Sequence, residues 1–329
     1  MILAAGLATR LQPLTLNRPK VLVPVQNRPL LDWLVAYLYS GGAEEVIVNT
    51  YHLSEKLIEY VESSDFPIPV HLRIEKTLLG TGGGIRNVMD FWDQRPFVVI
   101  NGDILSAIDL QGVLRSHEDS GATVTLVLKD EPLFNGVKVA SDGRILGFSG
   151  GSEQHLAFTG IHVLERRVLA GIPAGTPSSI IDCYLQLITR GEKVMAHVIQ
   201  DEFWRELGSL NGYLQMHEEF FRMSRTPVPG LQVDGKAVVH ESARLGSGVH
   251  VDGMVCIGAG CTLEHGVGIQ RSVIWEQVTI GSGCSIRDSI IGDGVVVTEP
   301  QEGVVIGSEG RGKIADFRFR ISDCGFEKE

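Results

Sequence analysis

Residues 3–20 read LAAGLATRLQPLTLNRPK, and this stretch decides the fold of the chain. It follows an apolar run that begins at Ile2, so the pattern predicts a β-strand that opens directly into a loop of small residues. Small residues let backbone N–H groups approach a phosphate, and Arg10 and Lys20 add positive charge. Ligands of open α/β sheets bind beyond the carboxyl ends of the strands, which favours a binding loop here. The alternative is a tight turn with incidental surface charges.

The rest of the first two thirds of the chain alternates between short β-rich runs and helical patterns. This alternation is typical of an α/β fold with a Rossmann-like, mainly parallel sheet that helices cover on both faces. The spacing of apolar residues predicts strands at residues 2–5, 46–50, 70–74, 97–101 and 123–128, and helices at 30–38, 53–61, 108–117 and 210–223.

Beyond residue 230 the pattern changes to a six-residue period. Aliphatic residues recur about every six positions and form a first row. A second row of small or aliphatic residues lies four positions beyond each of them, and glycine or an acidic residue often follows a residue of the first row. Such hexads predict a triangular coil in which each flat side directs one aliphatic residue inward, and glycine allows the backbone to turn at the corners. The pattern resembles the left-handed parallel β-helix of hexapeptide-repeat proteins. The first row is Val239, Leu245, Val251, Ile257, Leu263, Ile269, Ile274, Ile280, Ile286, Ile291 and Val297.

The change of period divides the chain into parts. We expect an α/β catalytic domain at residues 1–224, a stiff proline-containing linker at 225–231, the β-helix at 232–310 and a C-terminal tail at 311–329. A chain of 329 residues is long enough for two separate hydrophobic cores.

Charge and composition exclude several classes of protein. A net charge of −11 leaves no overall attraction to a polyanion, so neither nucleic acid nor an anionic membrane surface is expected as a partner. No run approaches the roughly 18 apolar residues that a membrane helix needs. The five cysteines are an odd number without a CxxC pair, which predicts a reducing, cytoplasmic location and no structural zinc.

Residues 3–20 resemble the signature of the sugar-phosphate nucleotidylyltransferases, usually written LAAGxGTRLxPLTxxxPKxxxPV, and we name them the signature loop. Ala8 stands where that signature has its second glycine. Further matches follow in the family's order at residues 79–85, LGTGGGI, and at residues 101–103, NGD, so the resemblance spans most of residues 1–220. The resemblance implies transfer of a nucleoside monophosphate from a nucleoside triphosphate to a sugar 1-phosphate.

The resemblance also assigns residues to the nucleotide. Arg10 is expected to bind the β- and γ-phosphates, and Lys20 the α-phosphate and the sugar phosphate. The backbone of the signature loop and the glycine-rich segment are expected to hold the base and ribose; the residues concerned are Leu3, Ala4, Ala5, Gly6, Thr9, Gly80, Thr81, Gly82 and Gly83.

Two carboxylates are candidate ligands of Mg²⁺. Asp103 follows an apolar strand, where a carboxylate can hold Mg²⁺ against the triphosphate; an ordinary turn aspartate is the alternative. Glu206 lies in residues 204–209, WRELGS, at the place of the family's W-x-D-[IV]-G-T segment, and is the candidate second ligand. A solvated glutamate at a helix entry is the alternative for Glu206.

The sugar side carries fewer motifs. Asn135 and Gly136 resemble the family's YGVV strand, and Thr159 and Gly160 resemble its T-G-[IL]-Y segment, which makes all four candidate sugar-phosphate contacts. The usual E-K-P segment is missing, since residues 148–153 read FSGGSE.

With its β-helix the chain looks more like the mannose-1-phosphate guanylyltransferases and glucose-1-phosphate transferases than like the N-acetylmuramate 1-phosphate uridylyltransferases, whose chains usually stop before any β-helix, and the mannose type is favoured. Uridylyltransferases acting on N-acetylmuramate 1-phosphate or glucose 1-phosphate are an alternative. Two others are a non-catalytic regulatory homologue that binds NDP-sugar, and a hexapeptide-repeat acyltransferase that uses His240, His250 or His265. The open ends of the β-helix favour a homo-oligomer.

Overall fold

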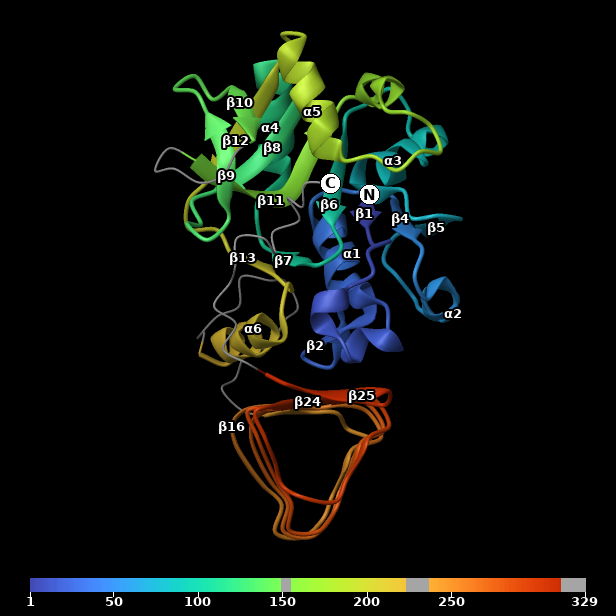
Figure 1. Ribbon diagram of the computed structural model, residues 1–329, viewed down its shortest axis with the longest axis vertical. Helices are drawn as coiled ribbons and strands as arrows, with labels where there is room; N and C mark the ends of the chain where they lie inside the picture. The colour runs from blue at the N-terminus through green and yellow to red at the C-terminus, as the bar shows by residue number, and fades with distance from the viewer. Residues whose placement is uncertain (149–154, 223–236, 315–329) are drawn as a thin grey trace. The chain divides into compact units, whose positions relative to one another are not determined.

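The computed structural model describes residues 1–148, 155–222 and 237–314 (Figure 1). Their contacts form two compact units. The first unit comprises Met1–Gly6 and Leu34–Trp204, and the second comprises Leu7–Trp33 and Arg205–Phe317, each as far as it is described. The predicted linker at residues 225–231 and residues 315–329 of the predicted tail lie outside the described residues.

The first unit is built on a nine-stranded sheet in which β1 (Ile2–Leu3) lies between two longer strands. It runs parallel to β4 (Val46–Thr50) and to β6 (Phe97–Asn101), and β4 runs parallel to β5 (Val70–Ile74). The predicted strands and their parallel pairing are therefore confirmed in this half of the sheet.

The other half of the sheet is antiparallel, so the sheet is mixed and the prediction of a mainly parallel sheet is wrong. Strand β11 (His155–Leu164) pairs antiparallel with β6, β8 (Val124–Lys129) and β9 (Asn135–Val139). In the described residues no helix separates β8 from β9 and β10 (Ile145–Phe148), and strands without a crossover helix pair antiparallel. Only β12 (Val194–Ile199) restores a parallel pair, beside β8.

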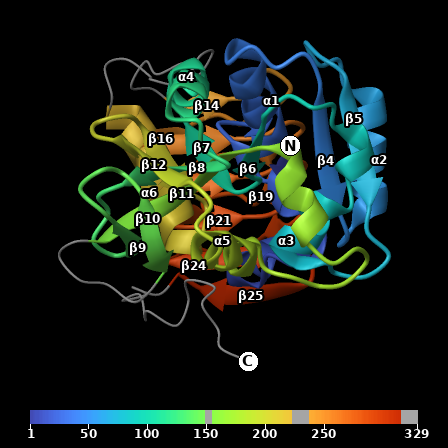
Figure 2. The same ribbon diagram turned by 90° about the horizontal axis from the view of Figure 1, so that it is seen from above.

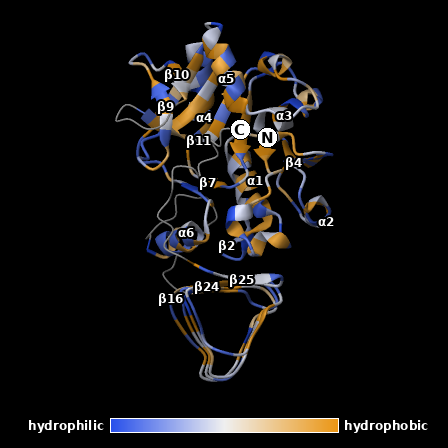
Figure 3. Cartoon of the chain, in the orientation of Figure 1, coloured by the Kyte–Doolittle hydropathy of each residue, from blue (hydrophilic) through white to orange (hydrophobic). Residues whose placement is uncertain are grey.

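Helices cover both faces of this sheet, as the alternating pattern predicts. Figures 1 and 2 show α4 (Leu110–Ser120) and α5 (Ile180–Thr189) on opposite faces, over strands that are mostly hydrophobic (Figure 3). Helix α4 ends at Gly121, whose left-handed backbone places its N–H on the carbonyl oxygens of the last turn. The other helices are α1 (Leu30–Ser40), α2 (Ser54–Ser63), α3 (Gly80–Arg86) and α6 (Leu210–Arg222).

The second unit contains coiled parallel strands. Val238 pairs with Cys256, 18 positions later, and Gly268 pairs with Ser285, 17 positions later, so one turn of the coil takes 17 or 18 residues. In Figure 1 these strands outline a triangle. The six-residue pattern marks the inward positions, because its first row is buried from Ile257 to Val297, although Val239 and Leu245 at its start are exposed.

The strands of the coil are short. They are β14 (Val238–Val239), β15 (Arg244–Leu245), β16 (His250–Ile257), β17 (Thr262–Leu263), β18 (Gly268–Ile274), β19 (Thr279–Ile280), β20 (Ser285–Arg287), β21 (Ile290–Ile291), β22 (Val296–Val297), β23 (Gln301–Glu302) and β24 (Val304–Gly307). After the coil, β25 (Gly310–Lys313) pairs antiparallel with β24.

Most of the signature loop folds with the coil rather than with the sheet, since the second unit begins at Leu7. From Thr9 onward the chain forms three 3-10 turns, η1 (Thr9–Leu11), η2 (Leu14–Leu16) and η3 (Lys20–Leu22), the last of which starts at the final residue of the signature loop. The short hairpin of β2 (Pro24–Val25) and β3 (Arg28–Pro29) follows. Asn27 then donates to the carbonyl oxygen of Ile257, in the coil, at 2.7 Å.

Candidate active site

The start of the signature loop is held by a buried polar network in the first unit. The Ala4 N–H donates to Asn49 Oδ1 at 2.8 Å, and Asn49 Nδ2 donates to Glu75 Oε1 at 2.7 Å. The other carboxylate oxygen of Glu75 accepts the N–H of Leu79 at 2.9 Å. Asn49 and Glu75 thus join the two segments that are predicted to hold the nucleotide.

Sequence reasoning assigned no role to Asn49 or Glu75. Each lies near the end of a strand, Asn49 directly after the three apolar residues of β4 and Glu75 directly after β5. A polar side chain at such a position in a parallel sheet was the signal that could have found them.

The glycine-rich segment forms the start of α3, and its glycines are needed for packing. A Cβ on Gly83 would lie 2.7 Å from the Thr176 carbonyl oxygen, and one on Gly82 would lie 3.0 Å from Ser179. Thr81 Oγ1 accepts the N–H of Ile180 at 2.9 Å. Gly82 and Gly83 are buried, whereas Gly80 and Thr81 are exposed and can be reached by a ligand.

Ala8 has a left-handed backbone, with φ 53° and ψ 37°. Glycine adopts this conformation without strain, which explains why the family signature has glycine at this position. Thr15 Oγ1 donates to the Ala8 carbonyl oxygen at 2.8 Å and supports the bend. The turn η1 starts directly after it and carries Arg10.

Arg10 and Glu206, two predicted site residues that are far apart in the sequence, lie together in the second unit. Arg10 Nη2 donates to Glu206 Oε1 at 3.0 Å, and the two side chains are 40% and 23% exposed. Gly208 lies against this pair, because a Cβ there would be 2.8 Å from Glu206 Oε1. The structure therefore places the predicted phosphate ligand against the predicted second metal ligand.

Lys20 is half-buried and opens η3. Pro19 precedes this turn, and its carbonyl oxygen accepts the N–H of Leu22 at 2.8 Å. The Lys20 carbonyl oxygen accepts the N–H of Val23 at 3.1 Å. Lys20 thus projects from a compact hydrogen-bonded turn.

Asp103 lies in the first unit between β6 and β7 (Ile104–Ser106) and is half-buried. The N–H of the preceding Gly102 donates to the Leu3 carbonyl oxygen at 2.8 Å, so Asp103 is anchored beside the start of the signature loop. Residues 1–148, 155–222 and 237–314 contain no group of three or more His, Cys, Asp or Glu residues that could hold a metal ion. A cation at Asp103 would therefore take at least part of its coordination from substrate and water.

The predicted sugar contacts are only partly brought together. Gly160 has φ 78° and lies against Asn101, so it adjoins the segment that carries Asp103. Thr159 is buried and donates to the Val127 carbonyl oxygen at 2.9 Å. Asn135 caps its own loop, where its Oδ1 accepts the N–H of Glu131 at 3.0 Å, and Gly136 is buried beside it. Residues 149–153 of the segment that replaces E-K-P lie outside the described residues.

Two further predictions concern cysteines and membranes. Cys183, Cys256, Cys261 and Cys284 are free and buried. Within the described residues, no helix has the length and apolar character needed to cross a membrane.

Comparison with known proteins identifies the family. The family model for nucleotidyl transferases matches residues 1–222, and the model for the GMPPB C-terminal domain matches residues 233–309. The mannose-1-phosphate guanylyltransferase of Mycobacterium tuberculosis H37Rv is 30% identical over 296 residues, which cover 87% of this chain and 82% of that protein. Mannose-1-phosphate guanylyltransferase 1 of Arabidopsis thaliana is also 30% identical, over 89% of this chain and 85% of its own.

A second enzyme type and a solved structure also match. The UTP–glucose-1-phosphate uridylyltransferase of Synechocystis sp. PCC 6803 is 27% identical, over 88% of this chain and 86% of its own. The crystal structure of HddC from Yersinia pseudotuberculosis, solved also as a complex with GMP-PN, shares the fold with a TM-score of 0.59 and 24% identity, over 67% of this chain and 97% of its own. The chain therefore belongs to the sugar-1-phosphate nucleotidylyltransferases, the nucleotidyl transferase enzymes that make an NDP-sugar from a nucleoside triphosphate and a sugar 1-phosphate.

Proposed function

We propose that this chain transfers GMP from GTP to mannose 1-phosphate, giving GDP-mannose and pyrophosphate. One observation carries the choice of substrates: mannose-1-phosphate guanylyltransferases recur among the relatives at 30% identity, against 27% for the uridylyltransferase from Synechocystis. Transfer of UMP to glucose 1-phosphate is the second candidate, because the uridylyltransferase from Synechocystis aligns over a similar share of the chain.

The proposed reaction is an in-line attack by a sugar-phosphate oxygen on the α-phosphorus of the triphosphate. One P–O bond forms and the bond to the pyrophosphate leaving group breaks, so no covalent intermediate with the enzyme is needed. Catalysis then consists of holding two anions together and neutralising the charge that develops on the phosphoryl groups. Arg10 binds the β- and γ-phosphates, and Lys20 binds the α-phosphate and the sugar phosphate.

Asp103 is proposed to hold the divalent cation, which is Mg²⁺. A single carboxylate fits this ion, because Mg²⁺ in nucleotide sites is bound by one or two carboxylates together with substrate phosphates and water. The cation would supply charge neutralisation at the phosphoryl oxygens. Glu206 stays a proposed second ligand, and any such role has to compete with its ion pair to Arg10.

The base and ribose are proposed to contact Leu3, Ala4, Ala5, Gly6, Thr9, Gly80 and Thr81. Gly82 and Gly83 also belong to the proposed nucleotide site, where they pack the start of α3 against the backbone of Ser179 and Thr176. The Ala4 N–H already donates to Asn49, so Ala4 contributes shape rather than a donor. Asn135, Gly136, Thr159 and Gly160 are proposed for the sugar phosphate.

For the coil we propose a left-handed β-helix of hexapeptide repeats that assembles the enzyme into a homo-oligomer. Val239 and Leu245, on the first turn, are 37% and 46% exposed although they occupy inward positions of the repeat. Light scattering should give a mass above that of one 35.8 kDa chain, and Leu245→Lys should reduce that mass.

The free cysteines support a cytoplasmic location.

The experiment that tests the function is pyrophosphate release over a grid of nucleoside triphosphates and sugar 1-phosphates. The grid includes mannose, glucose, N-acetylglucosamine, N-acetylmuramic acid and heptose 1-phosphates. We expect GTP with mannose 1-phosphate to give the highest kcat/KM. A preference for UTP with glucose 1-phosphate would establish the second candidate instead.

The roles of the residues are tested with Arg10→Ala and Asp103→Asn, each of which should lower turnover on the order of 100-fold. Arg144→Ala is the matched control, because Arg144 is exposed and pairs with its near neighbour Asp142. Near-normal turnover of Arg10→Ala and Asp103→Asn would contradict the assignment.

A further inference from the structure

Arg18 lies two positions before Lys20 and connects the turn that carries Lys20 to the coil. Its Nη1 donates to the carbonyl oxygen of Leu22, the last residue of η3, at 3.2 Å. The same guanidinium group donates to Glu276 Oε1 at 3.2 Å and to Asp293 Oδ2 at 2.9 Å. Both carboxylates belong to the coil, one turn apart, so a single side chain spans from the loop to two turns of the coil.

The surroundings of Arg18 restrict its movement. Its side chain is only 16% exposed, and its Cζ lies 5.3 Å from the centre of the buried Trp275 ring. Asp293 Oδ1 accepts the N–H of Glu276 at 3.2 Å, which fixes the acceptor as well. A planar guanidinium that bridges two carboxylates and stacks on a ring is held in one orientation more firmly than a lysine ammonium would be.

Pro19 transmits this restriction to Lys20. The proline ring fixes its φ, here −54°, and its carbonyl oxygen accepts the first hydrogen bond of η3. The turn that carries Lys20 is therefore linked to Arg18 at both ends: Pro19 joins its start to the Arg18 backbone, and the Arg18 guanidinium group bonds to the Leu22 carbonyl at its end.

We infer that Arg18 is a positioning residue through which the coil holds Lys20 in place for the reaction. The inference rests on the proposed function, because it takes Lys20 to bind the α-phosphate and the sugar phosphate. It gives the coil a direct part in catalysis besides assembly. A misplacement of about 1 Å in a catalytic group can lower turnover by up to two orders of magnitude, so such a link has a measurable effect.

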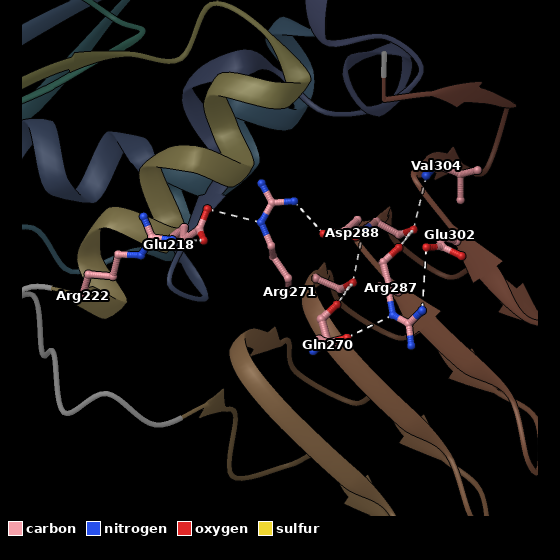
Figure 4. Close-up of polar contacts among 10 residues, drawn as sticks. Glu218, Arg222, Gln270, Arg271, Arg287, Asp288, Glu302 and Val304 are labelled. Atoms are coloured by element: carbon pink, nitrogen blue, oxygen red, sulfur yellow. Dashed lines mark hydrogen bonds and ion pairs between the residues drawn. The ribbon is translucent and has the colours of Figure 1, made fainter. Parts of the chain in front are cut away.

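A second set of ion pairs in the same unit provides a matched control (Figure 4). Arg271, on the coil, donates to Glu218 of α6 at 3.2 Å and to Asp288 at 2.6 Å. Like Arg18 it bridges two carboxylates, and it is 34% exposed. Arg271 joins the coil to α6 and not to the turn that carries Lys20, so its loss should affect stability without moving Lys20.

The experiment compares Arg18→Lys and Asp293→Asn with Arg271→Lys and Asp288→Asn in the full chain. For each variant we measure kcat, both KM values with the substrate pair that the grid selects, and the thermal unfolding midpoint. Arg18→Lys and Asp293→Asn should lower kcat on the order of 10-fold at a temperature well below unfolding. Arg271→Lys and Asp288→Asn should keep kcat within about 2-fold of the wild-type value, even if their unfolding midpoints fall as much as those of Arg18→Lys and Asp293→Asn.

A double-mutant comparison separates positioning from a general structural effect. In a Lys20→Ala background, Arg18→Lys should cause no further loss of kcat, because the group that Arg18 positions is gone. An additional 10-fold loss in that background, or a kcat of Arg18→Lys equal to that of Arg271→Lys, would overturn the inference. If Arg18→Lys does not fold, Asp293→Asn carries the same comparison. A wild-type enzyme that releases no pyrophosphate from any substrate pair would refute the proposed function instead.

Discussion

At the scale of single residues, Ala8 carries a strain that the family signature avoids. Its φ of 53° costs an alanine about 1 kcal/mol relative to glycine, because Cβ crowds the following carbonyl in the left-handed region. Ala8→Gly should therefore raise the free energy of unfolding by about 1 kcal/mol, measured by denaturant titration. Unchanged or lower stability would show that the rest of the loop does not hold Ala8 in this conformation.

Gly6→Ala provides the contrast within the same loop. A Cβ on Gly6 meets no atom within 4 Å, so the substitution should leave the free energy of unfolding nearly unchanged. The proposed function nevertheless predicts a lower kcat/KM for the nucleotide, because the added methyl group occupies space where the base and ribose are proposed to contact Gly6. Normal kinetics of Gly6→Ala would remove Gly6 from the proposed nucleotide contacts.

A buried histidine in the second unit makes folding sensitive to acid. His217 is fully buried, its Nδ1–H donates to the Tyr213 carbonyl oxygen at 2.9 Å, and its Nε2 accepts the N–H of Gln26 at 3.2 Å. Burial lowers the pKa of His217 to about 4. The unfolded chain, with the ordinary histidine pKa near 6.5, therefore binds more protons between about pH 4 and pH 6.5.

Because the unfolded chain binds more protons, the free energy of unfolding rises with pH across that window. The contribution of His217 is fully present above about pH 6.5 and is lost as the pH falls towards 4. His217 alone should contribute about 2 kcal/mol to the drop in the free energy of unfolding between pH 7 and pH 5. Denaturant titrations at both pH values measure the drop. His217→Gln should lower stability at pH 7 but reduce the difference between the two pH values. An equal difference in wild type and variant would rule His217 out as the cause.

At the scale of secondary-structure elements, α3 depends on glycine for packing rather than for flexibility. A Cβ on Gly83 would lie 2.7 Å from the Thr176 backbone oxygen, which cannot move as freely as a side chain. Gly83→Ala should lower the free energy of unfolding by about 1–3 kcal/mol, as overpacked substitutions do. Gly147→Ala in β10 is the control, because its Cβ would meet no atom within 4 Å. Equal stability of the two variants would contradict this account of α3.

The elements that could be predicted from the sequence are those with a strong local period. Strands β4, β5 and β6 follow from short β-rich runs, and the inward rows of the coil follow from the hexads. The antiparallel pairing of β11 could not be predicted in the same way, because strand direction depends on how the chain between two strands returns. Asn49 and Glu75 escaped assignment for a related reason: their roles depend on hydrogen bonds between neighbouring strands, which join Asn49 to Ala4 and to Glu75.

At the scale of the whole molecule, the chain's contacts do not follow the change of sequence period. The signature loop begins in the first unit and passes at Leu7 into the second, where Arg18 and Asn27 bond to residues more than 200 positions away. Such contacts leave no trace in local periodicity. The sequence therefore predicts the residues of the loop correctly as a family signature but does not reveal that the coil supports them.

A test of this organisation follows from the core of the coil. Ile280 is fully buried there, and Ile280→Ala should cost about 2–5 kcal/mol. The Leu22 amide donates to the Pro19 carbonyl oxygen in the turn that carries Lys20, and the Gly281 amide donates to the Val297 carbonyl oxygen in the coil. If the turn and the coil open together, Ile280→Ala should speed up hydrogen exchange at both amides by the same factor. The Val46 amide in the first unit is the internal control and should keep its protection. Faster exchange at Gly281 with unchanged exchange at Leu22 would show that the turn carrying Lys20 is stable without the coil.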